Sequence, residues 1–237
     1  EPAVGVRGVD DTLIQKSGEA PRRTAVRTSG PKDDVRPVDI HPADGVAQAS
    51  EVPRRATPVG EIDLARLLVS THKTVFGEPP TLARISVAWA HLALEHQRGA
   101  GVDDHNFGNI SVGDDYVGPY FLRQLAERQR DDAKAALGGW KTVGMRFAAF
   151  PDDVAGVTAY WRLLEAKYGS ALKLFDVGNA HNAGRKLAEL GYATAYPEPY
   201  AVSMSDLQGE FRRRILPAAA ELDVKRDFEG KLERPGD

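Results

Sequence analysis

The sequence predicts a mainly α-helical protein with a small β excursion, a mainly α form of the α+β class. Apolar residues recur at helical spacing from Glu61 onward, which predicts a helical core. Two short segments, residues 106–113 and 142–150, are typical of strands and lie between the second and third predicted core helices. The first 58 residues contain no Phe, Tyr or Trp and are expected to add nothing to that core.

Residues 1–58 differ in composition from the rest of the chain. Their prolines alternate with mixed charges, and such a segment buries too little apolar surface to offset the entropy of ordering it. We therefore predict a disordered, proline-rich arm or linker over residues 1–58. An anchoring or partner-binding tail is the alternative. The folded domain is expected over residues 59–217, followed by a polar tail over residues 218–237.

The first two helices have clear ends. A helix expected over residues 61–76 stops at Gly77, before Pro79-Pro80. A second helix begins after Thr81, whose hydroxyl can cap its first turn, and runs to Glu95. Two glycines just beyond Glu95 indicate where this helix stops.

The remaining elements follow in order. The polar segment 122–137 is interpreted as an exposed helix or a long insertion. Amphipathic patterns then predict one helix after Pro151, another over residues 179–190, and a last one over residues 199–215.

The composition excludes several function classes. A net charge of −3 and a pI near 6.1 lack the basic excess of a dedicated nucleic-acid binder, so we expect no nucleic-acid partner. Without cysteine, disulfides, thiol nucleophiles and Cys-ligated zinc are excluded. No apolar run approaches the ~20 residues that span a bilayer. No signal peptide is visible, although the chain begins with Glu rather than Met, so we keep export as an expectation.

Glu95 is the most informative residue. It follows Ala88 and Leu92 on the apolar stripe of its helix, and a carboxylate buried there is costly to ionise, which suits a general acid. The run His105-Asn106-Phe107-Gly108-Asn109-Ile110 comes shortly after it. Its amide groups can orient a polar ligand.

These segments resemble the glucosaminidase-type peptidoglycan hydrolases, the mannosyl-glycoprotein endo-beta-N-acetylglucosaminidase-like family that includes autolysin and flagellar muramidase domains. Residues 95–99 share the Glu and the last Gly of the family's Glu-Ser/Thr-Gly-x-Gly signature, and residues 106–110 match the turn that follows it. The Gly-Tyr-Ala-Thr segment 191–194, with a trailing Tyr, is similar to a late family block. Residues 146–151 and the next helix resemble the family's strand-then-helix block. The resemblance covers roughly residues 82–211, but His96 and Arg98 depart from the pattern.

The resemblance implies a lysozyme-like fold with a small β-hairpin lobe. It implies cleavage of glycosidic bonds in bacterial cell-wall glycan strands, with Glu95 donating a proton to the leaving oxygen. The residues expected to bind or support the substrate are Asn106, Phe107, Asn109, Tyr192 and Tyr200. For Tyr192, core packing is an equal alternative.

A second carboxylate is normally needed to activate water or to act as nucleophile. The candidates are Asp103, Asp104, Asp114 and Asp115, and we favour Asp114 or Asp115 at a hairpin tip facing Glu95. Ordinary turn chemistry is the simpler explanation of that pair, and a solvated loop explains the other. If neither pair reaches the site, Glu95 acts alone, as in a lytic transglycosylase or with help from the substrate N-acetyl group.

No cofactor and no metal site are expected. His91, Glu95 and His96 suggest a helical metal site only superficially, because the two histidines are five residues apart rather than four. The expected partner is the glycan of the bacterial cell envelope, in the periplasm or outside the cell, with phage or secretion systems as further settings. The rival hypothesis is a non-catalytic wall-binding module tethered through its arm to a larger assembly.

Overall fold

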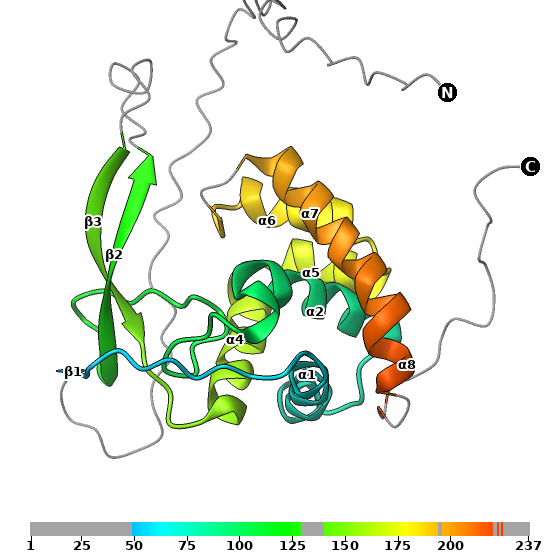
Figure 1. Ribbon diagram of the computed structural model, residues 1–237, viewed down its shortest axis with the longest axis horizontal. Helices are drawn as coiled ribbons and strands as arrows, with labels where there is room; N and C mark the ends of the chain where they lie inside the picture. The colour runs from blue at the N-terminus through cyan, green and yellow to red at the C-terminus, as the bar shows by residue number, and fades with distance from the viewer. Residues whose placement is uncertain (1–48, 129–139, 194–195, 220–221, 223, 225–237) are drawn as a thin grey trace, which may run out of the picture. The chain divides into compact units, whose positions relative to one another are not determined.

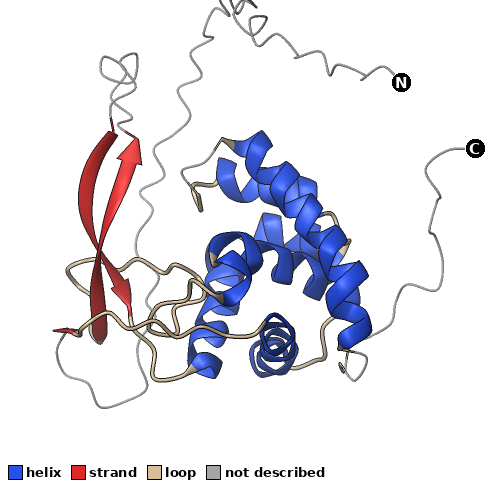
Figure 2. Cartoon of the chain, viewed as in Figure 1, coloured by secondary structure: helices blue, strands red, loops and turns tan. Residues whose placement is uncertain are grey.

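A computed structural model describes residues 49–128, 140–193, 196–219, 222 and 224, and the statements below concern these residues. Helices form most of the described chain, and the strands gather on one side of them (Figures 1 and 2). The strands are β1 (Ser50–Glu51), β2 (Pro119–Arg128) and β3 (Trp140–Ala148). The α-helices are α1 (Glu61–Phe76), α2 (Leu82–Glu95), α4 (Asp153–Lys167), α5 (Gly169–Asp176), α6 (Ala180–Glu189), α7 (Pro197–Glu210) and α8 (Leu216–Ala218). A 3-10 turn, η1 (Gln97–Gly99), follows α2, and a π-helical turn, η2 (Phe211–Ile215), follows α7.

The predicted helix ends are confirmed where local chemistry sets them. Gly77 takes the left-handed conformation, with φ of 77°, and ends α1. The Thr81 hydroxyl accepts a hydrogen bond of 3.0 Å from the backbone N–H of Arg84 and caps α2. The helices predicted at 179–190 and 199–215 are also present, as α6 and as α7 with its π turn. Two short α-helices were not predicted: α5, whose Leu172 and Phe175 are buried, and α8.

The helical core is built on large aromatic side chains. Trp89 of α2 and Trp161 of α4 are fully buried. Each indole N–H donates to a backbone carbonyl of α1, Trp89 to Glu61 at 3.0 Å and Trp161 to Leu68 at 3.2 Å. Burying such rings stabilises the fold, and the indole hydrogen bonds fix how α2 and α4 lie against α1.

Helix α4 approaches the loop after α2 very closely. A β-carbon added to Gly156 would lie 1.7 Å from the carbonyl oxygen of His105, so only glycine fits there. The Asp152 side chain caps the start of this helix. The tight contact holds the 105–107 segment in place under the site described below.

The sheet corrects two sequence-based expectations. Residues 119–128, which overlap the segment 122–137 interpreted as a helix or insertion, form β2, which pairs antiparallel with β3 and parallel with β1. Residues 106–113 are not a strand, because Ser111 makes only an isolated bridge to Phe147 of β3. Leu, Arg, Gln, Ala and Glu in β2 favour helix intrinsically, and pairing with β3 overrides that preference.

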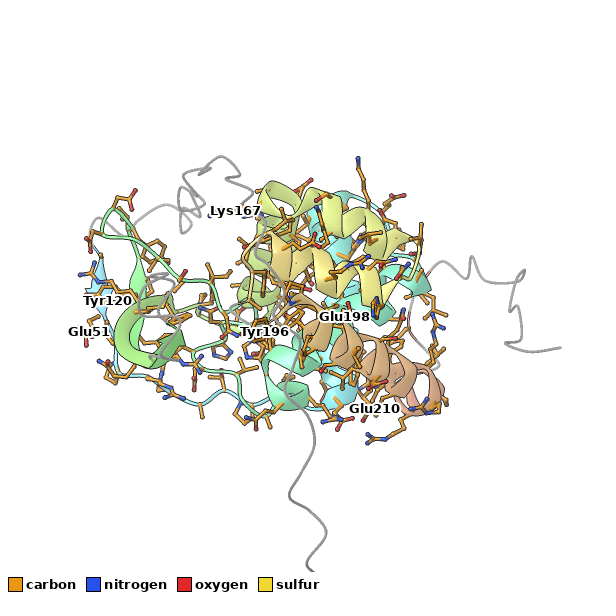
Figure 3. All side chains as sticks on the ribbon, turned by 90° about the horizontal axis from the view of Figure 1, so that it is seen from above. Glu51, Tyr120, Lys167, Tyr196, Glu198 and Glu210 are labelled. Atoms are coloured by element: carbon orange, nitrogen blue, oxygen red, sulfur yellow. The ribbon has the colours of Figure 1, made fainter. Side chains whose placement is uncertain are left out.

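Figure 3 shows Glu51 and Tyr120 on the strand side and Glu198 and Glu210 on helix α7.

The N-terminal boundary at residue 58 is also corrected. Residues 50–51 form β1, Ala56 bridges to Asp103, and the Thr57 backbone N–H donates to the Val102 carbonyl at 2.9 Å. These residues were assigned to the arm, yet they belong to the folded domain because they cover a buried polar segment. The rest of the predicted arm, residues 1–48, lies outside the described residues.

The predicted C-terminal tail is described only in part. Ala219 is buried, and Leu222 and Val224 pack against the main core, so the domain extends a few residues past 217. Residues 225–237 lie outside the described part of the chain. Within the described residues, none of the helices combines the length and apolar character required to cross a membrane.

Candidate active site

Glu95 ends α2 at the base of the site. It is half-buried, and each of its carboxylate oxygens accepts a hydrogen bond. The Tyr200 hydroxyl donates to Oε1, and the Asn109 side-chain amide donates to Oε2 at 2.9 Å. Three residues singled out from the sequence are thus joined by direct hydrogen bonds.

Tyr200 reaches Glu95 from the first turns of α7. Its side chain is buried, and α7 packs on α2, so the contact is part of the helical core. Burial, and next the charge of Glu95, raise the pKa of Tyr200 well above its ordinary value. The hydroxyl therefore keeps its proton and remains a hydrogen-bond donor to the carboxylate. We call α2 and α7 beside Glu95 the helical wall.

Asn109 approaches from the opposite side. It has a φ of 44°, a left-handed conformation that asparagine tolerates better than most residues. Its Oδ1 accepts a hydrogen bond of 3.2 Å from Nη1 of Arg123, a residue of β2. Because an amide nitrogen donates and an amide oxygen accepts, these two partners fix which way the Asn109 side chain points. We call residues 103–110 together with Arg123 the loop wall.

Arg123 was not predicted as a site residue. Its guanidinium lies 5.5 Å from the ring centroid of Phe147 and 4.0 Å from the carboxylate of Asp103. Through Asn109 it connects β2 to Glu95. The sequence gives no signal for Arg123, because the segment that contains this residue is not typical of a strand.

Asn106 and Phe107, which were expected to bind or support the substrate, both lie in the interior of the protein. The Asn106 amide donates to the carbonyls of Ile110 and Ala148, and its Oδ1 accepts from the Ile110 backbone N–H. Phe107 is fully buried in the main core and has no surface to offer a ligand. Both residues shape the turn that presents Asn109.

Tyr192 lies beside the same turn. Its hydroxyl donates to the Gly108 carbonyl at 2.8 Å, and its ring contacts His91 and Tyr168 at centroid distances of 4.5 and 5.1 Å. The packing alternative considered for Tyr192 therefore describes most of its contacts. The residue is partly exposed.

His91 and His96 have separate, buried environments. His91 Nδ1 is hydrogen-bonded to the Tyr160 hydroxyl at 2.9 Å, and burial lowers the pKa of His91 to about 3, so the ring is neutral. His96 Nε2 donates to the Phe107 carbonyl at 2.7 Å, and burial lowers its pKa as well. Among the described residues, no group of three or more His, Asp and Glu side chains is arranged to hold a metal ion.

The aspartate candidates are not placed as expected. Asp103 and Asp104 are buried rather than in a solvated loop, and they pair with Arg54 and Arg55 of the assigned arm. Asp104 accepts a hydrogen bond of 2.9 Å from the Arg55 backbone N–H. Both carboxylates serve to hold the loop wall in its conformation.

Asp114 and Asp115 lie in the exposed segment that leads into β2, not at a tip between two strands. Asp114 pairs with Arg146 at 2.7 Å, and its side chain is 97% exposed. Within the described residues, no hydrogen bond or ion pair links either aspartate to Glu95, Asn109 or Tyr200. Residues 129–139, which follow β2 in the chain, lie outside the described part.

Comparisons with known proteins agree on the fold. No protein-family model and no curated protein matches the chain. Among solved structures, a mutant of the peptidoglycan hydrolase from Sphingomonas sp. A1 matches with a TM-score of 0.50 and 21% identity, over 66% of this chain and 97% of that one. The catalytic domain of the autolysin Auto from Listeria monocytogenes matches with a TM-score of 0.47 and 17% identity, over 67% and 88% of the two chains.

The glycoside hydrolase domain of FlgJ from Salmonella typhimurium, in a C-terminally truncated form, matches with a TM-score of 0.43 and 17% identity, over 64% of this chain and 97% of that one. The Sphingomonas likeness establishes a shared fold: a helical domain with a small strand lobe, of the lysozyme-like kind predicted from the sequence.

Proposed function

We propose that this protein is a peptidoglycan hydrolase of the N-acetylglucosaminidase type, with Glu95 as its general acid. The observation that carries the proposal is the pair of hydrogen bonds that hold the Glu95 carboxylate between Tyr200 and Asn109. The fold shared with the Sphingomonas peptidoglycan hydrolase supports the same substrate class. The proposed setting is the bacterial cell envelope or the medium outside it.

The two hydrogen bonds suggest which oxygen carries the proton. The Asn109 side-chain nitrogen can only donate, so it keeps Oε2 as an acceptor. The Tyr200 hydroxyl donates to Oε1 while Glu95 is ionised, and because a tyrosine hydroxyl can also accept, the same contact allows a proton on Oε1. Glu95 would then protonate the glycosidic oxygen from Oε1 as the bond breaks.

The second half of the reaction needs a group that stabilises or captures the sugar cation. Asp114 and Asp115 remain candidates for activating water, although their exposure argues against a place in a shielded site. That exposure favours a second candidate mechanism, in which Glu95 acts alone. A hydroxyl or the N-acetyl group of the substrate would then close on the anomeric carbon.

Digestion of purified peptidoglycan, followed by mass spectrometry of the fragments, tests the proposal. New reducing N-acetylglucosamine ends support it, whereas reducing N-acetylmuramic acid ends indicate a muramidase and anhydro ends a transglycosylase. Wall fragments that are bound but never cut would support the non-catalytic module and overturn the enzyme.

The Glu95→Gln variant supplies the matched comparison. An amide cannot donate the required proton, so activity is expected to fall roughly 10²–10⁴-fold without loss of folding. Glu165→Gln is the control, because Glu165 is an exposed residue of α4 and makes no hydrogen bond or ion pair with the other described residues. Equal activity of the Glu95 variant and the parent would reject Glu95 as the acid.

A further inference from the structure

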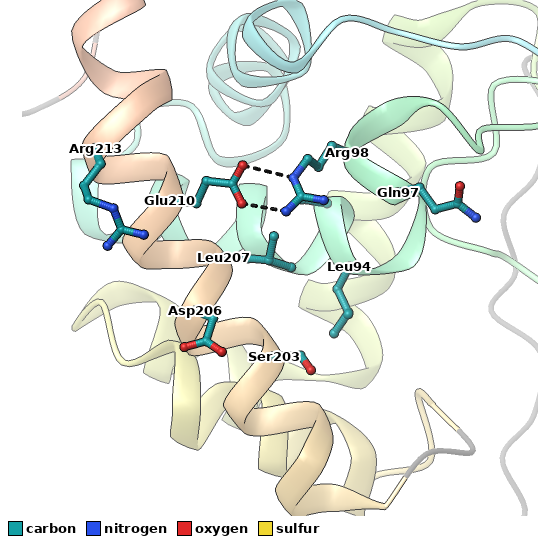
Figure 4. A pocket seen from close by; sticks show the side chains of 9 residues that line it. Leu94, Gln97, Arg98, Ser203, Asp206, Leu207, Glu210 and Arg213 are labelled. Carbon is teal, nitrogen blue, oxygen red and sulfur yellow. Dashed lines mark hydrogen bonds and ion pairs between the residues drawn. The ribbon is translucent and has the colours of Figure 1, made fainter. Parts of the chain in front are cut away.

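A groove runs beside Glu95, between α7 and the end of α2. It has a volume of about 660 Å³, within the range of pockets that bind ligands (Figure 4). Its lining combines apolar residues with ionic and polar ones. The lining residues are Ala93, Leu94, Gln97, Arg98, Ser203, Asp206, Leu207, Glu210 and Arg213.

Two of the charged side chains in the groove, Arg98 and Glu210, form an ion pair with each other. Arg98 donates to both carboxylate oxygens of Glu210, at 3.0 and 2.7 Å (Figure 4). Arg214, which lies outside the groove lining, also contacts Glu210. The Arg98 hydrogen bond, the largest cause, lowers the pKa of Glu210, so this carboxylate stays ionised and paired. This cluster ties the turn after Glu95 to α7 and has little free charge for a ligand.

Two other charges in the groove are free. Asp206 and Arg213 are exposed, and neither makes a hydrogen bond or ion pair with any described residue. Gln97, also exposed, is unpaired in the same sense and has a φ of 49°. The groove thus offers one free carboxylate, one free guanidinium and a free amide above apolar side chains. That combination suits a ligand with both an amino group and a carboxylate.

One end of the groove is lined by residues close in the chain to Glu95 and Tyr200. Leu94 is the chain neighbour of Glu95, and Ser203 lies one helical turn beyond Tyr200. From Ser203 to Arg213 the helix advances about 15 Å, at roughly 1.5 Å per residue. An extended peptide of roughly four residues covers a similar length, about 13–14 Å.

We propose that this groove binds the peptide stem attached to the glycan strand. The proposal rests on the proposed function, since the glycan must lie at Glu95 for its peptide to reach α7. Stem peptides carry free amino and carboxylate groups, which complement Asp206 and Arg213, and alanine methyl groups, which match Leu94 and Leu207. A further stretch of neutral sugar would gain little from two free opposite charges.

The test compares two substrates that differ only in the peptide. Peptide-bearing soluble glycan strands and the same strands stripped by an amidase are digested by the parent and by the double variant Asp206→Asn, Arg213→Gln. Exposed ionic contacts contribute about 0.2–1 kcal/mol each, so kcat/KM on the peptide-bearing strands should fall roughly fivefold relative to the stripped strands. The control is Arg185→Gln, Glu189→Gln, which removes one charge of each sign from two exposed positions of α6 that do not line the groove and whose partners lie on α6 itself.

An unchanged ratio of the two kcat/KM values in the double variant would overturn the peptide assignment, whether both values fall together or neither falls. If the parent cuts neither substrate, the proposed function fails first. Calorimetric titration with a free stem tetrapeptide then decides the groove by itself. Binding by the parent that weakens in the double variant supports the groove, and no binding by the parent rejects it.

Discussion

Glu95 has the helical wall on one side and the loop wall on the other, and the two walls are held by different forces. In the helical wall, large side chains such as Trp89 and Tyr200 are buried, and α7 packs directly on α2. In the loop wall, polar groups are buried as well as apolar ones, with Asp103, Asp104 and Asn106 almost without exposure. Apolar burial tolerates small adjustments, whereas buried carboxylates depend on particular partners. The loop wall should therefore be the easier wall to disrupt by removing a distant segment.

Truncation of the N-terminus is expected to produce the largest loss of stability. Deleting residues 1–58 removes the Arg54 and Arg55 partners of Asp103 and Asp104, and each unsatisfied buried group costs roughly 1–3 kcal/mol. We expect the midpoint of thermal unfolding to fall by several degrees, measured by calorimetry or circular dichroism. Deleting only residues 1–48 is the control and should leave the midpoint close to that of the full chain. Equal midpoints for both truncations would contradict a role for residues 49–58 in the loop wall.

Removing the Tyr200 hydroxyl tests the contribution of the helical wall at its contact with Glu95. Hydrogen bonds to charged groups contribute about 1.5–3 kcal/mol, so Tyr200→Phe should lower kcat roughly 10-fold or more and shift the pH profile of cleavage. Tyr168→Phe is the matched control, because its ring packs on Tyr192 and no hydrogen bond ties its hydroxyl to Glu95. A Tyr200→Phe enzyme with the parent's kcat and pH profile would show that the hydroxyl only fills space.

The helical wall and the loop wall also differ in how well they could be predicted from the sequence. The helical wall follows from local patterns, such as the apolar stripe that ends at Glu95 and the Thr81 cap. The loop wall depends on contacts between distant residues, such as Arg55 with Asp104, which are 49 positions apart and leave no periodic signal. Arg123 was missed for a related reason, since β2 consists of good helix formers that become a strand only by pairing with β3.

Three residues singled out by sequence motifs lie together in the structure, and their roles in catalysis stay predictions. Glu95, Asn109 and Tyr200 come from three separate segments, and each belongs to a motif of the family that the sequence resembles. Phe107 belongs to the same motif but lies in the core, because a sequence motif preserves the residues that shape a turn together with those that face its ligand. Burial and hydrogen bonding are needed to tell which residues of the motif shape the turn and which face a ligand.

Acid is expected to lower the free energy of unfolding. Per pH unit, this effect is expected to be smaller than the effects of the truncation and of Tyr200→Phe. Burial lowers the pKa of His91 to about 3 and that of His72 to about 4, whereas both titrate near 6.5 in an unfolded chain. Below pH 6.5 the unfolded chain therefore binds protons that the folded one does not. The free energy of unfolding should fall with decreasing pH, by up to about 1.4 kcal/mol per pH unit for each histidine, until the folded pKa values are reached.

Urea unfolding between pH 7.5 and 5 measures this slope. The His91→Gln variant should show a shallower slope than the parent, because it loses one proton-binding group from the unfolded state. His181→Gln, which alters an exposed histidine of α6, serves as the comparison. If the slope is the same in His91→Gln and the parent, burial of a neutral His91 does not contribute to acid sensitivity.

Cleavage in water enriched in heavy oxygen tests the central claim, that Glu95 donates the proton in a hydrolysis, most directly. The parent should produce new reducing N-acetylglucosamine ends that carry the heavy isotope, read by mass spectrometry, and Glu95→Gln should produce almost none. Asp114→Asn and Asp115→Asn, measured in parallel, report whether either aspartate activates the water. Label-free anhydro ends, or labelled ends formed equally well by Glu95→Gln, would contradict the account.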